Sequence, residues 1–456
     1  MKKTRTKYTC QSCGYEAPGW MGKCPECDAW NTFVEESVIP SKNRGTAKTV
    51  SSAKPQPISG ISGENRQRLK TGIKEFDRVL GGGIVAGSVN LIGGAPGIGK
   101  STLLLQIGAA LAGTGKTVLY VSGEESVQQI KLRADRLKVQ SEHFLLAAET
   151  HVESIESMLN DMKPDLTIVD SIQTVYASEL ESLPGNVSQV RFSGHRLTQA
   201  AKALHTPMFL IGHVTKDGHL AGPRVLEHMV DCLLLLEGDD QHFYRLLRSA
   251  KNRFGSTNEV GIFEMTDHGV MEVRNPSAHL LSQRHEGTPG TVVTVNLEGS
   301  RPLMVEVQAL VSPTSYGIPQ RTSTGIDHRR LSILLAVLEK RLGLRFGNQD
   351  VFVNAAGGIR LNEPGVDLAV AIALVSSLKD QPVHGQTAVI GEVGLTGEVR
   401  GISQIEKRIA EVERLGFDRL ILPDVSLKSF RKKAVIKLDG AATLKKAVDL
   451  CFKDDK

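Results

Sequence analysis

The 456-residue sequence has no long apolar segment and no strong excess of charge of either sign. No hydrophobic run approaches the roughly 20 residues that a membrane-spanning helix needs. The basic start, MKKTRTKYTCQSCG, is not followed by the apolar region of a secretory signal. The net charge of +5 favours an anionic partner only weakly. These absences predict a cytoplasmic protein with no membrane contact, and the length predicts two or three domains.

Cysteine is also scarce, and four of the six cysteines lie within the first 35 residues. Cytoplasmic thiols are reduced, so paired cysteines there bind metal more often than they form disulfides. The segment CQSCGYEAPGWMGKCPEC contains two CxxC turns, whose thiolates can complete a tetrahedral zinc shell. The predicted zinc ligands are Cys10, Cys13, Cys24 and Cys27. So short a segment needs metal to fold, and a closed four-sulfur shell has no open position for catalysis.

Composition and periodicity divide the chain into four parts. Residues 1–35 form the predicted C4 zinc finger, and residues 36–68, rich in Ser, Gly, Pro and basic residues, read as a flexible linker. From residue 69 to 275, apolar strands alternate with helices, which predicts an α/β domain with a parallel sheet covered on both faces. Residues 276–456 begin with strands and end with helices, which predicts a further α/β domain.

The stretch GAPGIGKS matches GxxxxGK[ST] between a predicted strand and a predicted helix, the context that a phosphate-binding loop requires. Its backbone N–H groups and the helix N-terminus bind phosphates, Lys100 reaches the β- and γ-phosphates, and Ser101 binds Mg²⁺. The sequence therefore predicts ATP and Mg²⁺ as cofactors. The predicted nucleotide-binding residues are Gly94, Ala95, Pro96, Gly97, Ile98, Gly99, Lys100, Ser101, Thr102 and Asp170.

Polar side chains follow the other predicted strands of this domain. Asp170 ends the apolar LTIVD and is the expected second Mg²⁺ anchor, although a strand-end cap is the simpler alternative. Glu124 follows YVSG, where a carboxylate can polarise the attacking water, and Glu125 is the alternative for that role. His213 follows LIG, where it would sense the γ-phosphate or be an ordinary loop histidine.

These strand-end residues, in this order, resemble the RecA-like P-loop ATPase core. With the CxxC turns and the segments VSGEES, IVDSIQT, GHVTKDG and KNRFG, nearly the whole chain is similar to the bacterial RadA (Sms) family of recombination and DNA-repair ATPases. The resemblance implies a DNA-dependent ATPase that translocates on single-stranded DNA and promotes branch migration of recombination intermediates. It also implies a hexameric ring, a RecA-type recombinase as partner, and branched DNA as substrate. The alternative is an ATP-switched adaptor that loads a recombinase without motor activity.

The segment KNRFG places Lys251 and Arg253 on a tip after an apolar strand. They match the spacing of a K-x-R pair with which DnaB-type replicative helicases contact the nucleotide of the neighbouring subunit. Cations added in this way stabilise charge on the transferred phosphoryl group. Direct contact with DNA and a solvated loop remain alternatives. RecA-like rings bind DNA with loops that here would lie near 176–192 and 214–226, and the candidates are Arg191, Lys216 and Arg224, for which a plain surface role is equally open.

Residues 290–456 resemble the proteolytic domain of Lon proteases, most clearly in GEVGLTGEVRGISQIEKRIAEVERLGF. Lon-type chemistry uses a serine that a lysine deprotonates. In this chain Asp367 falls at the serine position and Glu406 at the lysine position, and Lys407 would point about 100° away around the helix. The dyad is therefore absent. We expect a scaffold for ring assembly, with possible DNA contacts, rather than a peptidase.

Overall fold

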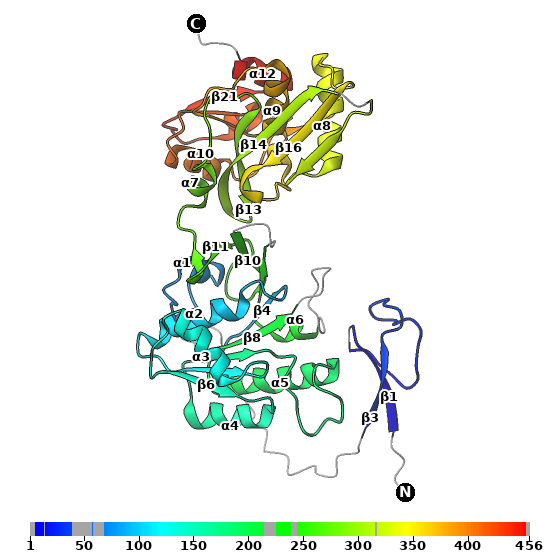
Figure 1. The fold of residues 1–456 in the computed structure, drawn as a ribbon, viewed down its shortest axis with the longest axis vertical. Helices are drawn as coiled ribbons and strands as arrows, with labels where there is room; N and C mark the ends of the chain where they lie inside the picture. Colours follow the sequence, from blue (N-terminus) through cyan, green and yellow to red (C-terminus); the bar gives the residue numbers. More distant parts are fainter. Residues whose placement is uncertain are drawn as a thin grey trace. The chain divides into compact units, whose positions relative to one another are not determined.

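The computed structural model describes residues 5–12, 14–38, 57, 68–213, 225–238, 244–314 and 317–452. The chain divides into two compact units, Met1–Val273 and Arg274–Lys456, and each is described by itself (Figure 1). Across the described ranges, no helix combines the length and the apolar character needed to cross a membrane. Most of the predicted linker lies outside the described residues.

The N-terminal segment is a small antiparallel sheet in the order β2-β1-β3. Its strands are β1 (Arg5–Cys10), β2 (Glu16–Ala17) and β3 (Phe33–Val38). The hydrophobic core described for it contains only Cys10, Ala17, Cys24 and Phe33 as buried members. β3 continues past residue 35, the predicted end of this domain, because it pairs with β1 along the whole length of both strands.

The rest of the first unit is built on a nine-stranded sheet. The strands are β4 (Val89–Gly94), β5 (Val118–Ser122), β6 (Phe144–Ala148), β7 (Leu166–Asp170), β8 (Met208–His213), β9 (Cys232–Glu237), β10 (Tyr244–Asn252), β11 (Val260–Thr266) and β12 (Gly269–Glu272). Their order is β12-β11-β10-β9-β4-β8-β7-β5-β6. The strands from β9 to β6 are parallel. β10 pairs antiparallel with β9, and β11 and β12 extend the sheet beyond β10, each antiparallel to the strand before it.

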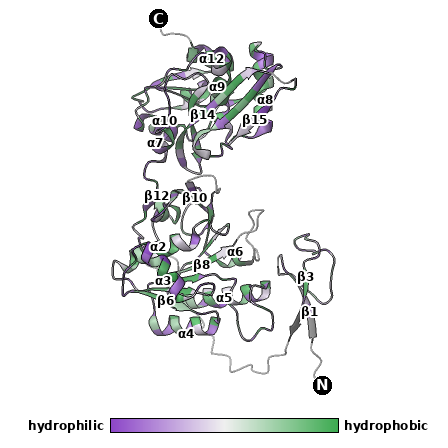
Figure 2. Cartoon of the chain, in the orientation of Figure 1, coloured by the Kyte–Doolittle hydropathy of each residue, from purple (hydrophilic) through white to green (hydrophobic). Residues whose placement is uncertain are grey.

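Helices cover both faces of this sheet. One face carries α1 (Lys74–Val79), α2 (Lys100–Ala112) and α3 (Val127–Arg136), and the other carries α4 (Val152–Met162), α5 (Val187–Ala203) and α6 (Val225–Met229). Every residue of β4, β5 and β7 is buried, as expected for parallel strands between two helical layers. In Figure 2 these strands are predominantly hydrophobic, whereas the helices are mixed. The predicted α/β architecture is confirmed.

The two edges of the parallel strands have different neighbours. At the edge where the strands end, which we call the carboxyl edge, Gly94 pairs with His213, and Ser122 pairs with Asp170. At the opposite or amino edge, Asn90 pairs with Cys232, which also pairs with Asn252. Because β10 runs antiparallel to β9, the end of β10 lies at the amino edge.

The second unit contains a seven-stranded sheet in the order β15-β16-β14-β13-β17-β20-β21. Its strands are β13 (Thr291–Glu298), β14 (Arg301–Pro313), β15 (Arg321–Thr324), β16 (Gln349–Ala355), β17 (Thr387–Val389), β20 (Arg419–Pro423) and β21 (Lys437–Ala441), and β18 (Glu392–Val393) pairs separately with β19 (Val399–Arg400). The helices are α7 (Pro276–Leu281), α8 (His328–Leu342), α9 (Asp367–Lys379), α10 (Ile405–Arg414), α11 (Asp424–Ser429) and α12 (Leu444–Phe452). α9 is buried from Asp367 to Ser376, so it forms the centre of this unit.

Candidate functional site

The loop between β4 and α2 has a backbone that only glycine adopts readily. Gly97 and Gly99 have φ angles of 77° and 110°. A Cβ on Gly99 would lie 2.5 Å from Cε of Met265, so side-chain packing also requires glycine there. Ala95, Pro96 and Gly97 are exposed at the carboxyl edge, and the N-terminus of α2 follows directly. This geometry fits the binding of phosphate by backbone N–H groups and a helix N-terminus.

Lys100 is the first residue of α2 and is buried. Its Nζ donates hydrogen bonds to the carbonyl oxygens of Gly94 and Ala95, each at 2.9 Å. Burial lowers the pKa of Lys100, and the negative charges of Asp170 and Glu124 oppose this change. The ammonium therefore lies close to both carboxylates that the sequence assigned to this site.

Asp170, the last residue of β7, is buried beside the loop. Its Oδ2 accepts a hydrogen bond of 2.5 Å from the hydroxyl of Tyr120. Burial, and then the Asp170 charge, raise the pKa of Tyr120 well above its ordinary value, so Tyr120 stays protonated and remains a donor. No sequence pattern singles out Tyr120, because it lies within the apolar strand β5.

The two candidate glutamates after β5 have different contacts. Glu124 accepts a hydrogen bond from the hydroxyl of Ser171, the residue that follows Asp170. Glu125 instead forms an ion pair with Arg133 of α3. The structure thus brings Glu124 together with Lys100 and Asp170, and it holds Glu125 against a helix on the outside of the site.

His213 ends β8 at the carboxyl edge, where its backbone pairs with Gly94. The structure does not describe its side chain, so its predicted role stays a prediction. Ser101 and Thr102 are partly exposed in the first turn of α2. Lys216 and Arg224 lie outside the described residues, together with most of the predicted loop 214–226.

Lys251 and Arg253 lie at the amino edge, opposite the nucleotide-binding loop. The predicted tip differs from the structure, because β10 continues through Lys251 to Asn252 after an irregularity in register between Ser249 and Lys251. Lys251 Nζ donates to the carbonyl oxygen of Glu227 at 2.7 Å, near the end of α6. Burial is the main cause that lowers the pKa of Lys251, followed by the charge of Arg253.

Arg253 is half exposed and forms an ion pair with Asp231. The distance between Arg253 Nη1 and Asp231 Oδ1 is 3.4 Å, and the side chain of Arg253 is 53% exposed. Asp231 is buried, and its other oxygen accepts a hydrogen bond from the backbone of Val89 at 3.1 Å. The Arg253 guanidinium is therefore presented to solvent from a fixed base.

The remaining residues of KNRFG attach the segment to the domain. The Asn252 side chain donates to the carbonyl oxygen of Val79, and Arg68 donates to that of Phe254 at 2.6 Å. A Cβ on Gly255 would lie 3.2 Å from Cα of Gly81, so the two backbones approach closely. Sequence analysis missed this structural role, since Arg68 is 186 positions from Phe254.

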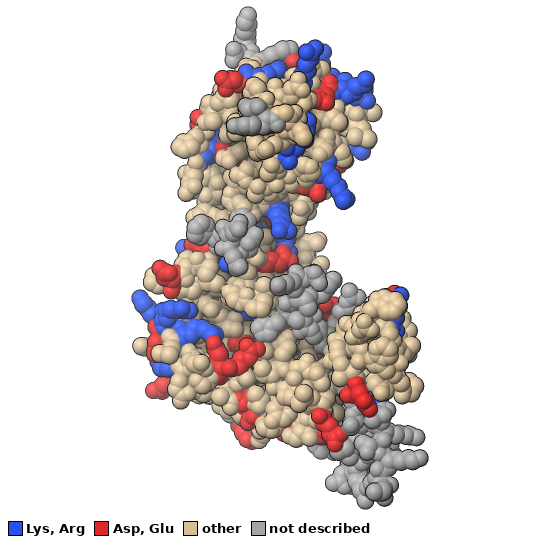
Figure 3. All heavy atoms as spheres, turned by 45° about the vertical axis from the view of Figure 1, so that its right-hand side comes forward, with Lys and Arg blue, Asp and Glu red and all other residues tan. Residues whose placement is uncertain are grey.

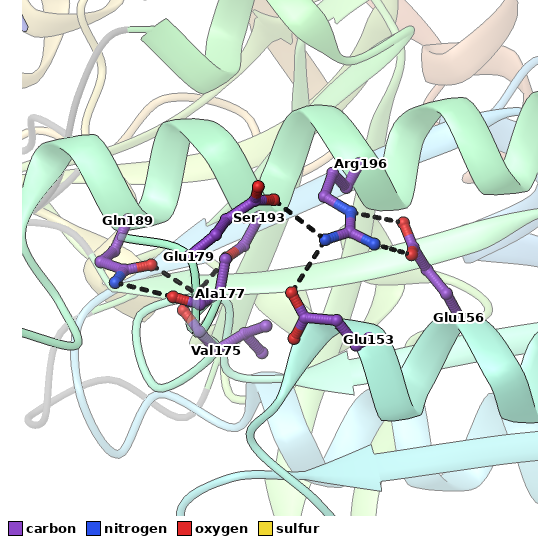
Figure 4. Close-up of polar contacts among 8 residues, drawn as sticks. All are labelled: Glu153, Glu156, Val175, Ala177, Glu179, Gln189, Ser193 and Arg196. Carbon is purple, nitrogen blue, oxygen red and sulfur yellow. Dashed lines mark hydrogen bonds and ion pairs between the residues drawn. The ribbon is translucent and has the colours of Figure 1, made fainter. Parts of the chain in front are cut away.

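Arg191 is exposed on α5, but the segment before this helix is acidic. Figure 4 shows Arg196 of α5 between Glu153, Glu156 and Glu179, with Nη1 at 2.8 Å from Glu153 and 3.3 Å from Glu179. In the same view Gln189 exchanges hydrogen bonds with the backbone of Ala177. On the face shown in Figure 3, the basic side chains of this unit gather toward its left side, and acidic side chains are spread over its lower part. Side chains of α5 thus bond the segment before this helix at Ala177 and Glu179, and its acidic residues do not favour the binding of DNA phosphates.

Three of the four predicted zinc ligands meet in the N-terminal sheet. The sulfur atoms of Cys10, Cys24 and Cys27 lie within 4.8 Å of one another, and the Cys10 and Cys27 sulfurs are 3.8 Å apart. Zn–S bonds of about 2.3 Å in a tetrahedron place sulfurs roughly 3.8 Å apart, so the cluster fits zinc. Cys13 lies outside the described residues.

The Lon-like positions in the second unit hold carboxylates with cationic partners. Asp367 begins α9, and its Oδ1 is 2.6 Å from Nε of Arg330, although the contact lacks the alignment of a hydrogen bond. Glu406 pairs with Lys432 at 2.6 Å, and Lys407 donates to the backbone of Ser300. Arg408, two residues after Glu406, is fully buried; it donates to the carbonyl oxygen of Val295 and pairs with Glu363.

Comparison with known proteins covers all three regions. Residues 8–35 match the family described as rubredoxin metal binding domain, residues 59–219 the AAA domain, and residues 313–426 the subunit ChlI of Mg-chelatase. DNA repair protein RadA of Bacillus subtilis (strain 168) is 52% identical over 454 residues, which cover 98% of this chain and 99% of the relative. DNA repair protein RadA of Listeria monocytogenes serovar 1/2a is 49% identical over 99% of each chain. Among solved structures, the RadB recombinase is 25% identical, with a TM-score of 0.37, and covers 45% of this chain and all of its own.

Proposed function

The chain belongs to the RadA family of DNA repair proteins, and from this premise we propose that it is a cytoplasmic, DNA-dependent ATPase that moves along single-stranded DNA and promotes branch migration of recombination intermediates. The cofactors are structural Zn²⁺, ATP and Mg²⁺. One observation carries the proposal: the Lys100 ammonium lies in the field of both Asp170 and Glu124, at the carboxyl edge beside a phosphate-binding loop.

The residues at this edge divide the chemistry among themselves. When phosphate binds in the loop, Lys100 would exchange its hydrogen bonds to the carbonyl oxygens of Gly94 and Ala95 for bonds to phosphate oxygens. The position of Lys100 beside the loop keeps its ammonium within reach of the phosphates. Ser101 and Asp170 are the residues that would hold Mg²⁺, which neutralises charge on the phosphates when it is bound. Glu124 would orient and polarise the attacking water. Hydrolysis by in-line attack needs these groups and no covalent intermediate.

We assign Lys251 and Arg253 to the nucleotide of a neighbouring subunit. Asn252, which stands between the two cations, lies level with Asn90, and the loop begins after Gly94, four residues further along β4. At about 3.3 Å per residue, the two edges are roughly 13 Å apart along the strand, with the sheet between them. Action within one chain is therefore disfavoured, whereas a subunit that places its amino edge against the next carboxyl edge would supply both cations. A hexameric ring is the arrangement we propose, with the Lon-like unit as a scaffold.

The proposed DNA contacts come from two regions, α5 and the loop after β8. Arg191 is exposed, and Lys216 and Arg224 remain candidates from the sequence. Because Glu179 and Glu181 are exposed on the segment before α5, we expect the loop after β8 to contribute more to phosphate binding than this segment. A RecA-type recombinase is the proposed protein partner.

The decisive experiment supplies Mg²⁺-ATP and a synthetic three-stranded branched DNA, without recombinase. Wild type should move the branch, and Lys251→Ala and Lys100→Ala should not. Mixed assemblies of these two variants then test action between subunits: one interface in a mixture combines an intact loop with an intact cation pair, so some ATPase activity should return. Wild type that hydrolyses ATP but moves no branch would instead favour the ATP-switched adaptor that loads a recombinase.

A further inference from the structure

Ser171 connects the two strand ends that carry the acidic residues of the nucleotide site. It follows Asp170 at the end of β7 and is fully buried. Its hydroxyl donates a hydrogen bond to Oε1 of Glu124, which follows β5. β5 and β7 are neighbours in the sheet, and the backbone N–H of Gly123 donates to the carbonyl oxygen of Asp170 at 2.8 Å. The serine hydroxyl thus reaches Glu124 from a rigid part of the fold.

The backbone of Ser171 is itself held from two sides. Its carbonyl oxygen accepts hydrogen bonds from the N–H and the hydroxyl of Thr174, the latter at 2.8 Å. The next residue, Ile172, donates its N–H to Ile211 of β8 at 3.0 Å. A Cβ at Gly123 would collide with the Thr174 hydroxyl, so glycine is needed where the two segments meet. These contacts fix the backbone from which the Ser171 hydroxyl bonds Glu124.

A glutamate side chain has several rotatable bonds, and Glu124 lies in a turn rather than in a strand. A water-orienting carboxylate must be held in a narrow range of positions, because a displacement of about 1 Å can cost up to about a hundredfold in rate. Hydrogen bonding to a buried hydroxyl restricts the rotamers without neutralising the carboxylate. We propose that Ser171 is a positioning residue for ATP hydrolysis, which fixes the Glu124 carboxylate toward the attacking water. This inference rests on the proposed role of Glu124.

The test compares steady-state ATP hydrolysis by wild type, Ser171→Ala, Glu124→Gln and the double variant, all as full chains with single-stranded DNA. Ser171→Ala should lower kcat about tenfold or more while KM and the affinity for a fluorescent ATP analogue stay the same, since the hydroxyl positions a group used in the chemical step. Glu124→Gln should lose more, and the double variant should match Glu124→Gln, because Ser171 would act through Glu124. Ser171→Thr, which keeps a hydroxyl, should restore part of kcat.

Ser193→Ala is the matched control. Ser193 is also fully buried in this unit, but its hydroxyl contacts the carbonyl oxygen of Val175 at 3.5 Å, and it does not contact Glu124. Its basal turnover should equal that of wild type. If Ser171→Ala does not fold, Ser171→Cys, a nearly isosteric and weaker donor, replaces it in the same comparison.

The outcomes separate the inference from the proposed function. Wild-type kcat in Ser171→Ala, with Glu124→Gln impaired, overturns the positioning role and leaves the role of Glu124 intact. Full turnover in Glu124→Gln overturns the assignment of Glu124 and the inference with it. Losses that add in the double variant show that Ser171 acts independently of Glu124, which also contradicts the proposal. A drop in kcat that vanishes in the Glu124→Gln background supports it.

Discussion

The nucleotide site and the Lon-like positions both contain acidic residues, but these residues have different partners. Asp170 accepts from the Tyr120 hydroxyl and Glu124 from the Ser171 hydroxyl, which are neutral donors. Asp367 and Glu406 instead face the cations Arg330 and Lys432. A neutral donor orients a carboxylate without offsetting its charge, and the nearby Lys100 ammonium donates its hydrogen bonds to the carbonyl oxygens of Gly94 and Ala95. A paired cation offsets the charge of its carboxylate directly.

Burial increases the contrast at Asp367. Desolvation raises the pKa of Asp367 to about 7, against the opposing charge of Arg330. At the position where Lon proteases have a serine, a carboxyl paired with a guanidinium supplies no hydroxyl nucleophile. A carboxylate at a position that is catalytic in Lon proteases therefore does not by itself make an active site. The groups that surround the carboxylate determine what it can do.

The largest difference is expected between two matched variants, each of which exchanges one carboxylate for an amide: one in the nucleotide site and one at a Lon-like position. Glu124→Gln should lower kcat for ATP by about 10²- to 10⁴-fold, because the amide cannot polarise water. Glu406→Gln should leave ATP hydrolysis unchanged. Steady-state assays with single-stranded DNA measure both. An equal loss of kcat in the two variants would contradict the assignment of hydrolysis to Glu124 and of a non-catalytic role to Glu406.

Glu363→Gln tests whether the ion pair between Arg408 and Glu363 stabilises the fold of the second unit. Arg408 is fully buried and pairs with Glu363, so removing the charge of Glu363 leaves a buried guanidinium without its counter-ion. We expect a loss of about 3 kcal/mol in the free energy of unfolding. Urea titration of the full chain, followed by a probe in the second unit, checks this. A change no larger than that of a surface variant would show that the backbone carbonyls alone satisfy Arg408.

Asp367→Asn tests the raised pKa. A carboxyl with a folded pKa above its ordinary value stabilises the fold while protonated, and this stability is lost as the pH rises through about 7. Between about pH 5 and about pH 8, the wild type should therefore lose about 2.6 kcal/mol relative to Asp367→Asn. Thermal unfolding at several pH values measures the difference. Parallel curves for the two proteins would contradict the assignment.

The smallest effect should follow Lys432→Ala, which removes the exposed partner of Glu406. The two side chains are 69% and 51% exposed, so solvent screens the pair. The free energy of unfolding should change by less than about 1 kcal/mol, and the difference should shrink further in high salt. A larger loss would mean that this pair supports the fold in the way proposed for Arg408 and Glu363.

Much of the fold follows from local sequence pattern. The apolar runs predicted β4, β5, β7 and β8, and the glycine-rich loop between β4 and α2 located the nucleotide site. These features depend on neighbouring residues, so periodicity reveals them. Three of the four predicted zinc ligands, Cys10, Cys24 and Cys27, lie together, because each CxxC turn is also local.

The parts that sequence analysis missed depend on contacts between distant residues. Glu124 and Ser171 are 47 positions apart, and Tyr120 and Asp170 are 50 apart. The choice between Glu124 and Glu125 was open because adjacent residues share the same pattern, and their contacts differ: Glu124 accepts from Ser171, whereas Glu125 pairs with Arg133. The position of Lys251 at the amino edge follows from the pairing order of β4, β9 and β10, which no local pattern encodes.

The two edges of the nine-stranded sheet give each chain a head and a tail. A contact that joins the carboxyl edge of one copy to the amino edge of the next is heterologous, because it uses two different surfaces. Repetition of this contact produces either a closed ring of copies or an open helical filament. An open assembly of any length would leave one loop without cations and one cation pair without a nucleotide, at its opposite ends. Closure would complete every site at once, so in the proposed arrangement the maximum turnover per subunit would be reached only when the assembly has no ends.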